Sequence, residues 1–385
     1  MLDIIKRGSS LIKYNSIQYN QLYCLVFAFV IFENWALGDK VCLADILYLV
    51  FAILFLVRST NCKSRSKKYY LYPIIFLCIA MYDYFLFHAN SMFMSQLRFV
   101  YNCSIFAILY NFFLNSSSYT KEKLISSYVY ICVLFSVFII CQFLSFYLLR
   151  YNLSFDFGQF QGSINHASLA VPSLGVVYRT GGFFKEPSWY AVFMGPVLEI
   201  AYRKNRLAEL IVCIIGIILS TSSMGFLFVV LFLFFNLRRN MKYAIIFLLL
   251  IFLVYLAFPM AFVRFFEALN FEEGAENSNN SRVLIPFSII FESDFLSILG
   301  MDISSIYSVY QDIFLNTFLF VLLSFGIVGL SIFVRILVRH KSYGLISIIL
   351  STVIIEGCYG RIDFWLALLA ASVYSITPLK PLNNK

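Results

Sequence analysis

The chain has 385 residues, of which 61% are hydrophobic and only 13% charged, and its mean hydropathy is +0.84. A soluble protein carries about 25% charged residues, so this composition excludes a water-facing globule. The net charge of +9 would suggest nucleic-acid binding in a soluble chain. In a membrane protein, the positions of the basic residues matter more than their sum. The sequence predicts an all-α polytopic integral membrane protein with a single membrane domain over residues 1–385 and no nucleic-acid partner.

About twelve transmembrane helices are expected, because apolar runs of bilayer length repeat along the chain. No small-residue cleavage site follows the first run, so we expect an uncleaved first span. The stretch 207–237 would form a helix about 46 Å long, which exceeds the about 30 Å membrane core, so we divide it at Ser220–Ser223. The predicted runs are 20–36, 41–57, 69–87, 96–114, 125–149, 188–202, 207–221, 223–237, 243–261, 313–334, 343–358 and 364–379.

The basic residues predict the orientation of these spans. Seven clusters, five between the spans and one at each end of the chain, hold 21 of the 29 basic residues. With twelve spans, every cluster falls on one face, which the positive-inside rule makes cytoplasmic. Both termini are then cytoplasmic. The clusters are Lys6/Arg7/Lys13, Arg58/Lys63/Arg65/Lys67/Lys68, Lys121/Lys123, Arg203/Lys204/Arg206, Arg238/Arg239/Lys242, Arg335/Arg339/Lys341 and Lys380/Lys385.

Two long loops, 150–187 and 262–312, fall on the opposite, periplasmic face, and loops of this length are usually functional or disordered. The remaining basic residues lie in outer loops or at outer helix ends. For Lys40, Arg98 and Arg150 we favour simple snorkelling to the membrane surface. The acids within the spans lie mostly near span ends, where snorkelling also suffices; these are Asp45, Asp83, Glu199, Glu209 and Glu356.

The segment from Tyr178 to Ala191, YRTGGFFKEPSWYA, ends the first long loop. Its two glycines permit a sharp turn, and Pro187 suits the first position of the following helix. Glu186 then lies just before a helix N-terminus, where the helix dipole favours a carboxylate. Arg179 offers a planar fork that suits phosphate oxygens. Two interpretations stay open: a well-formed helix start, or a site for an anionic lipid head group.

An Arg, then Gly-Phe-Phe, then Glu-Pro-Ser before an apolar helix resembles the signature of the O-antigen polymerase (Wzy-type) family, which is related to the O-antigen ligases. The family's later motifs resemble Arg282 in NSRVLIPF, Leu299-Gly300 in ILGMD and Asn316 in LNTFLFVLLSFGIVG. The resemblance covers residues 178–329, and the twelve-span layout with two large outer loops is also similar.

The resemblance implies polymerisation of undecaprenyl-pyrophosphate-linked oligosaccharide repeats on the periplasmic face of a bacterial inner membrane. It implies a metal-independent glycosyltransferase without a cofactor, because the glycosyl pyrophosphate bond supplies the energy. A chain-length regulator and a flippase are the implied protein partners. The implied catalytic residues are Arg179, Glu186 and Arg282, and the implied substrate-binding residues are Gly182, Arg264, Asn316 and Arg361.

Several alternatives remain open. An O-antigen ligase is expected to carry a functional His in the second long loop, and residues 262–312 contain none. A flippase or secondary transporter usually shows half-to-half repeats and paired charges at mid-membrane depth, and we see no repeat. A lipid-phosphate glycosyltransferase would place catalytic acids in the first outer loop. Glu33 and Asp39 could serve there, although that loop is short. No nucleotide-binding, His-based metal or acyltransferase motif is visible.

Overall fold

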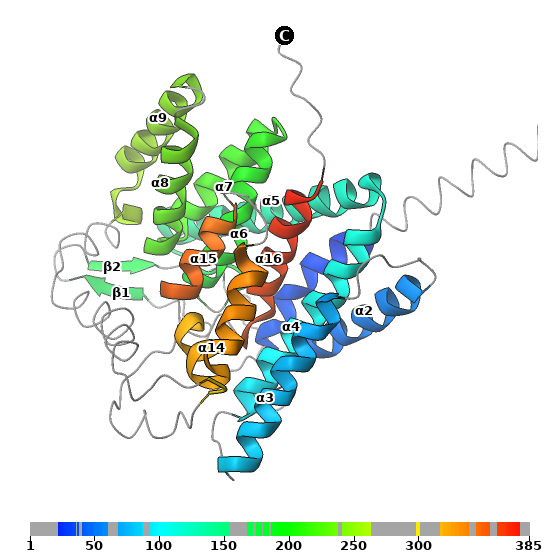
Figure 1. The fold of residues 1–385 in the computed structure, drawn as a ribbon. Helices are drawn as coiled ribbons and strands as arrows, with labels where there is room; N and C mark the ends of the chain where they lie inside the picture. The colour runs from blue at the N-terminus through cyan, green and yellow to red at the C-terminus, as the bar shows by residue number, and fades with distance from the viewer. Residues whose placement is uncertain are drawn as a thin grey trace, which may run out of the picture.

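The computed structural model describes residues 22–35, 37, 41–60, 68–87, 93–151, 153, 168–171, 175–178, 180–184, 186–237, 241–262, 298–300, 316–338, 344–354 and 360–377. Most regular structure within these residues is helical, and each of the twelve predicted apolar runs overlaps a helix (Figure 1). The helices are Leu22–Asn34 (ending in the 3-10 segment η1, Phe29–Asn34), α2 (Leu43–Thr60), η2 (Lys68–Tyr70), α3 (Leu71–Phe87), α4 (Phe93–Asn115), α5 (Ser118–Leu149), α6 (Pro187–Arg203), α7 (Leu207–Leu219), α8 (Ser223–Leu237), α9 (Met241–Ala257), η3 (Pro259–Phe262), α14 (Thr317–Val338), α15 (Gly344–Ile354) and α16 (Ile362–Ser375).

The stretch 207–237 forms two helices with a break where the sequence predicts one, because α7 ends at Leu219 and α8 begins at Ser223. Between them, Thr221 takes a left-handed backbone conformation with φ of +57°. The Ser222 hydroxyl accepts a hydrogen bond from the Gly225 N–H at 3.2 Å. A hydroxyl in this position caps a helix start, and so the serine- and threonine-rich stretch interrupts an otherwise continuous apolar run.

Three helices of the described residues, α4, α5 and α14, are long and apolar enough to cross a membrane by length and composition. Several others are apolar but shorter, such as α7 with 13 residues. The outward faces of α2, α3 and α9 expose large apolar side chains, which is unfavourable in water and compatible with contact to lipid. These side chains include Ile53, Leu54 and Val57 of α2, Leu71, Ile74 and Phe85 of α3, and Ile245, Leu249 and Phe252 of α9.

Helix α6 lies in the middle of the described helices and contacts α5, α7, α8, α15 and α16 (Figure 1). Its side chains are buried almost throughout. Close packing depends on Gly195, where an added Cβ would lie 2.5 Å from the Ser347 hydroxyl of α15. Helix α6 is therefore held by five neighbouring helices, and the candidate site is built on its first turn.

A second close approach breaks α14. Gly326 has φ of +63° inside the helix, and a Cβ there would lie 2.3 Å from the Ile298 carbonyl oxygen. Gly300 has φ of +107°, and a Cβ there would lie 2.5 Å from the Ser324 carbonyl oxygen. Only glycine tolerates both conditions. The Leu299-Gly300 turn thus packs directly against the break in α14, which joins two of the motifs noted in the sequence.

The first long loop contains structure that the apolar pattern did not predict. Ser168–Val171 (β1) pairs antiparallel with Gly175–Tyr178 (β2), with Leu169 opposite Val177. The sequence predicts only a loop here, because four-residue strands are too short to give a clear period. The hairpin ends immediately before the Arg-Thr-Gly-Gly segment that leads into α6.

Candidate functional site

The turn before α6 forms as its sequence predicts. Gly182 has φ of +63°, and a Cβ on Gly181 would lie 2.5 Å from the Phe184 carbonyl oxygen. The Phe184 N–H donates to the Gly181 carbonyl at 3.0 Å, which closes the turn. Pro187 is the first residue of the helix and Glu186 its N-cap residue, so the predicted helix start is confirmed. The half-buried Glu186 carboxylate accepts a hydrogen bond from the Ser188 hydroxyl at 3.1 Å.

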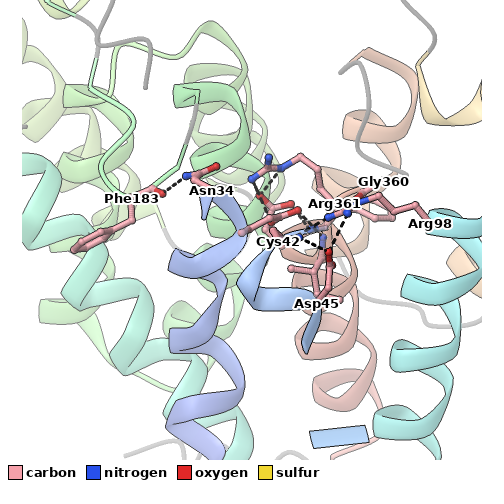
Figure 2. Close-up of polar contacts among 11 residues, drawn as sticks. Asn34, Cys42, Asp45, Arg98, Phe183, Gly360 and Arg361 are labelled. Atoms are coloured by element: carbon pink, nitrogen blue, oxygen red, sulfur yellow. Dashed lines mark hydrogen bonds and ion pairs between the residues drawn. The ribbon is translucent and has the colours of Figure 1, made fainter. Parts of the chain in front are cut away.

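This turn is joined to the end of the first helix. The Asn34 side-chain amide donates to the Phe183 carbonyl oxygen at 2.7 Å, as Figure 2 shows. The Phe183 ring stacks on Phe138 of α5, with ring centres 4.2 Å apart. The Gly-Gly-Phe-Phe segment is therefore held from two sides, by the first helix and by α5.

Arg361, at the N-cap position of α16, links the α6 turn to buried carboxylates. Its guanidinium carbon lies 3.5 Å from the centre of the Trp189 ring, where the π face attracts a cation. Its Nη2 lies 3.2 Å from Glu33 Oε2, and Nε and Nη2 each donate to Asp363 Oδ2 at 3.0 Å. Glu33 also accepts from the Ile362 N–H at 3.1 Å, so this carboxylate lies at the N-terminus of α16, where the dipole favours a negative charge.

A second arginine, Arg98 of α4, binds its own set of partners (Figure 2). Its Nη1 pairs with Asp45 Oδ2 at 3.1 Å, its Nε donates to the Gly360 carbonyl at 2.6 Å, and its Nη2 lies 3.6 Å from Cys42 Sγ. The Asp45 backbone carbonyl accepts a hydrogen bond from the Tyr101 hydroxyl. The snorkelling predicted for Arg98 is therefore wrong, because its guanidinium binds three partners within the protein.

We refer to Glu33, Asp45, Arg98, Arg361 and Asp363 as the charge cluster. It joins the first helix, α2, α4 and the start of α16, and Trp189 connects it to α6. Arginine stays charged at physiological pH, so two positive charges face three carboxyl groups. In the topology expected from the sequence, all of these helix ends lie on the outer face.

A cavity of about 640 Å³ opens beside the charge cluster. This volume lies within the roughly 300–1,000 Å³ of small-molecule sites. Its wall combines the polar groups of Glu33, Asn34, Asp45, Arg98 and Arg361 with apolar and aromatic side chains. Val41 lies just before α2, and the others come from α2, α4 and α6: Ile46, Leu49, Met94, Leu97, Tyr101 and Trp189. The cavity can therefore accept a ligand with both polar and apolar faces.

Two carboxylate oxygens of the cavity-lining residues accept no hydrogen bond from the described part of the chain. They are Glu33 Oε2, which has only the 3.2 Å ion pair to Arg361, and Asp45 Oδ1. Buried polar atoms in proteins are normally hydrogen-bonded. Both oxygens are buried, and the negative charge at Glu33 Oε2 is balanced by its ion pair with Arg361.

The residues predicted from the sequence fall into three groups. Arg361 belongs to the charge cluster, and Gly182 and Glu186 form the turn and N-cap of α6. Asn316 is buried and its side-chain oxygen accepts from the Leu319 N–H at 2.8 Å, which makes it the N-cap of α14. The third group lies outside the described residues, and consists of Arg179, Arg264 and Arg282.

Four residues at this place were not predicted from the sequence as site residues: Arg98, Asp45, Asp363 and Trp189. One signal was present: Arg98 and Arg361 both depart from the positive-inside preference, and Asp45 lies at an outer span end in the same topology. Opposite charges at helix ends on one face are candidates for pairing. What the sequence could not show is which of these ends are neighbours.

The snorkelling expected for the span acids is also wrong for two further residues. Asp83 of α3 is 2% exposed and its Oδ2 accepts from the Gln96 amide at 2.7 Å. Glu199 of α6 is 3% exposed and pairs with Arg203 at 2.8 Å. Glu356 and Lys40 lie outside the described residues, whereas Arg150 is exposed at the end of α5, as snorkelling requires.

Comparisons of the chain with protein-family models, with curated proteins and with solved structures found no match. Within the described residues, no group of three or more His, Cys, Asp or Glu side chains could hold a metal ion.

Proposed function

We propose that the protein is a membrane glycosyltransferase that polymerises undecaprenyl-pyrophosphate-linked oligosaccharide repeats into a surface polysaccharide. One observation carries the proposal beyond the sequence motifs. The Gly-Gly-Phe-Phe turn and the first turn of α6 carry the polymerase-like signature. The Phe183 carbonyl binds Asn34 of the cavity wall, and Trp189 both lines the cavity and contacts Arg361 of the charge cluster. A motif that served only to start a helix would have no reason to line a ligand-sized cavity.

In the proposed reaction, a hydroxyl oxygen of the acceptor repeat attacks the anomeric carbon of the donor glycan. A new glycosidic bond forms, the bond from that carbon to the pyrophosphate oxygen breaks, and undecaprenyl pyrophosphate leaves. Arg179 and Arg282 would stabilise the charge that develops on the leaving pyrophosphate. Glu186, at the start of α6, would take the proton of the attacking hydroxyl.

Substrate binding by Gly182, Arg264, Asn316 and Arg361 completes the proposed site. The contacts of Arg361 support a role in substrate binding, because its side chain contacts Trp189 of the first turn of α6 and lines the cavity. Gly182 supports the site by allowing the turn that precedes Glu186. The proposed reaction uses the energy of the glycosyl pyrophosphate bond and so needs no nucleotide sugar.

The proposed location is the bacterial inner membrane, with twelve spans, cytoplasmic termini and the active face toward the periplasm. A flippase would supply the lipid-linked repeats and a chain-length regulator would act with the polymerase. The apolar helices and their exposed apolar faces support a membrane location. The contact between Lys204 and Glu122, 3.3 Å apart, supports the topology, because it joins two chain segments expected on the cytoplasmic face.

One structural feature favours a second candidate function. Glu33 lines the cavity beside Arg361, and a lipid-phosphate glycosyltransferase would need a catalytic acid in this first outer segment. Such an enzyme would take a single sugar from a polyprenyl monophosphate. Supplying the purified protein with monophosphate-linked sugar or with pyrophosphate-linked repeats in parallel separates the two functions.

Deleting the gene and examining the surface polysaccharide tests the proposal. Loss of a polymerase leaves a single repeat attached to its final anchor. Loss of a ligase leaves no repeat attached, and loss of a flippase or transporter traps intermediates on the cytoplasmic side. An unchanged long polysaccharide in the deletion strain would refute the proposed function.

A further inference from the structure

The break in α14 redirects a backbone hydrogen bond to the second long loop. In a continuous helix, the Val328 N–H would donate to the Ser324 carbonyl four residues earlier. Here it donates to the Ile298 carbonyl at 3.3 Å. Backbone polar groups inside a membrane need partners within the protein, because the bilayer core supplies none. The loop segment 298–300 therefore provides α14 with an acceptor at its break.

Two buried side chains from other helices meet the same break. Nε2 of Gln96, on α4, donates to the Ser324 carbonyl at 3.4 Å. The same nitrogen donates to Oδ2 of Asp83, on α3, at 2.7 Å, so both hydrogens of the amide are used. The Ser324 carbonyl is also the group that Gly300 approaches most closely. Asp83 thus orients the amide that binds α14 at the point where the loop segment packs.

Aromatic side chains fix the break next to these polar contacts. The ring centre of Phe325 lies 5.0 Å from that of Phe76 on α3 and 5.1 Å from that of Phe99 on α4. All three rings are fully buried. The break is therefore seated on α3 and α4 through apolar as well as polar contacts, and the loop segment is seated on the break.

We propose that Gln96 and Asp83 are positioning residues that anchor the second long loop through the break in α14. The inference rests on the proposed polymerase function, because the anchored loop, 262–312, contains Arg282. In that function the loop places a guanidinium at the leaving pyrophosphate. A misplacement of about 1 Å can lower the rate of such a step about a hundredfold. Both positioning residues are buried and act through the loop, not by contact with the substrate.

Three variants separate this role from general packing. Q96M keeps the length of the side chain and removes both donated hydrogen bonds. D83N is the conservative variant, because it keeps the size of the side chain and an oxygen that accepts from the Gln96 amide. The matched control is N102L, which removes an equally buried amide from α4 about 9 Å further along the helix. Within the described part of the chain, the Asn102 amide forms no hydrogen bond.

Two measurements on purified full-length protein in detergent micelles provide the test. One is the steady-state kinetics of elongation with lipid-linked repeats. The other is hydrogen–deuterium exchange in peptides that cover residues 298–300, which reports local opening of the anchor without reference to activity. Thermal unfolding of each preparation reports whether the variant is folded.

We expect Q96M to lower kcat for elongation about ten- to hundredfold, with little change in KM, because the leaving-group charge develops only in the transition state. Exchange in residues 298–300 should become faster in the same variant. D83N should keep most of the wild-type kcat and a slow exchange. N102L should match the wild type in both measurements.

The inference is overturned if folded Q96M elongates like the wild type, or if its exchange in residues 298–300 matches that of N102L. It is also overturned if D83N loses as much activity as Q96M, because the hydrogen bond to the amide would then be irrelevant. If Q96M does not fold, D83A tests the same contact from α3 and should speed the exchange. Faster exchange in Q96M, in a protein that elongates nothing, would refute the proposed function and leave the anchor standing.

Discussion

Substitution of Arg361 is a stringent test of the charge cluster, because this side chain supplies the positive charge that pairs with two buried carboxyl groups. The side chains of Glu33 and Asp363 are each 2% exposed and both contact its Nη2. Removing one partner of a buried ion pair costs about 3–5 kcal/mol, because the remaining charge stays buried without compensation. We therefore expect R361A to lower the free energy of unfolding by about 3–5 kcal/mol.

Two further variants separate charge from shape. R361K keeps the positive charge but loses the paired donation to Asp363 and the planar stack on Trp189, so we expect a smaller loss of about 1–2 kcal/mol. Adding E33Q to R361A should recover part of the stability, because one of the uncompensated charges is then removed. Arg335, which is exposed near the end of α14, supplies the control, and R335A should leave the free energy of unfolding unchanged.

Equilibrium unfolding in mixed micelles of dodecyl maltoside and increasing SDS, followed by circular dichroism, measures these differences. A double-mutant cycle over E33Q and R361A gives the coupling energy between the two residues directly. A loss below about 1 kcal/mol in R361A, or additive effects in the cycle, would refute the inference that the pair is a buried ion pair.

Three other predictions concern topology and activity. A reporter that is active only outside the cytoplasm should be active when fused after Ser163 and silent after Arg239, and activity after Arg239 would contradict the division of the stretch 207–237 into two spans. Elongation of lipid-linked repeats should persist in excess EDTA, because neither long loop has the residue spacing of a metal site; a loss that magnesium restores would contradict this. R179A and R282A should each reduce elongation about ten- to hundredfold, and the lysine variants should recover only part of it. Folded alanine variants that still make long polymer would exclude these arginines from the site.

The sequence predicted those parts of the fold that depend on neighbouring residues. The apolar runs predicted the positions of the helices, because a backbone in an apolar environment must satisfy its own hydrogen bonds. The break between α7 and α8 and the start of α6 were also predicted correctly. In both places a short run of turn-forming or capping residues interrupts the apolar pattern, and these residues act within a few positions of themselves.

The charge cluster required the tertiary structure. Arg98 and Asp45 are 53 positions apart, and Glu33 lies 329 positions before the Ile362 N–H that it binds. The sequence shows charges at the ends of several helices, and at each end snorkelling was the simpler interpretation. Which ends meet is decided by the packing of α2 and α16 on α4, and of the end of the first helix on α2 and α16.

The sequence by itself determined that the chain is helical, apolar and strongly asymmetric in charge, because these properties follow from composition and from the local periodicity of the residues. Only the tertiary structure decided that Glu33, Asp45, Arg98, Arg361 and Asp363 share one place beside a cavity. The physical reason is that an ion pair depends on distance in space, and that distance is set by the packing of helices that are remote in sequence, such as α2 and α16 against α4.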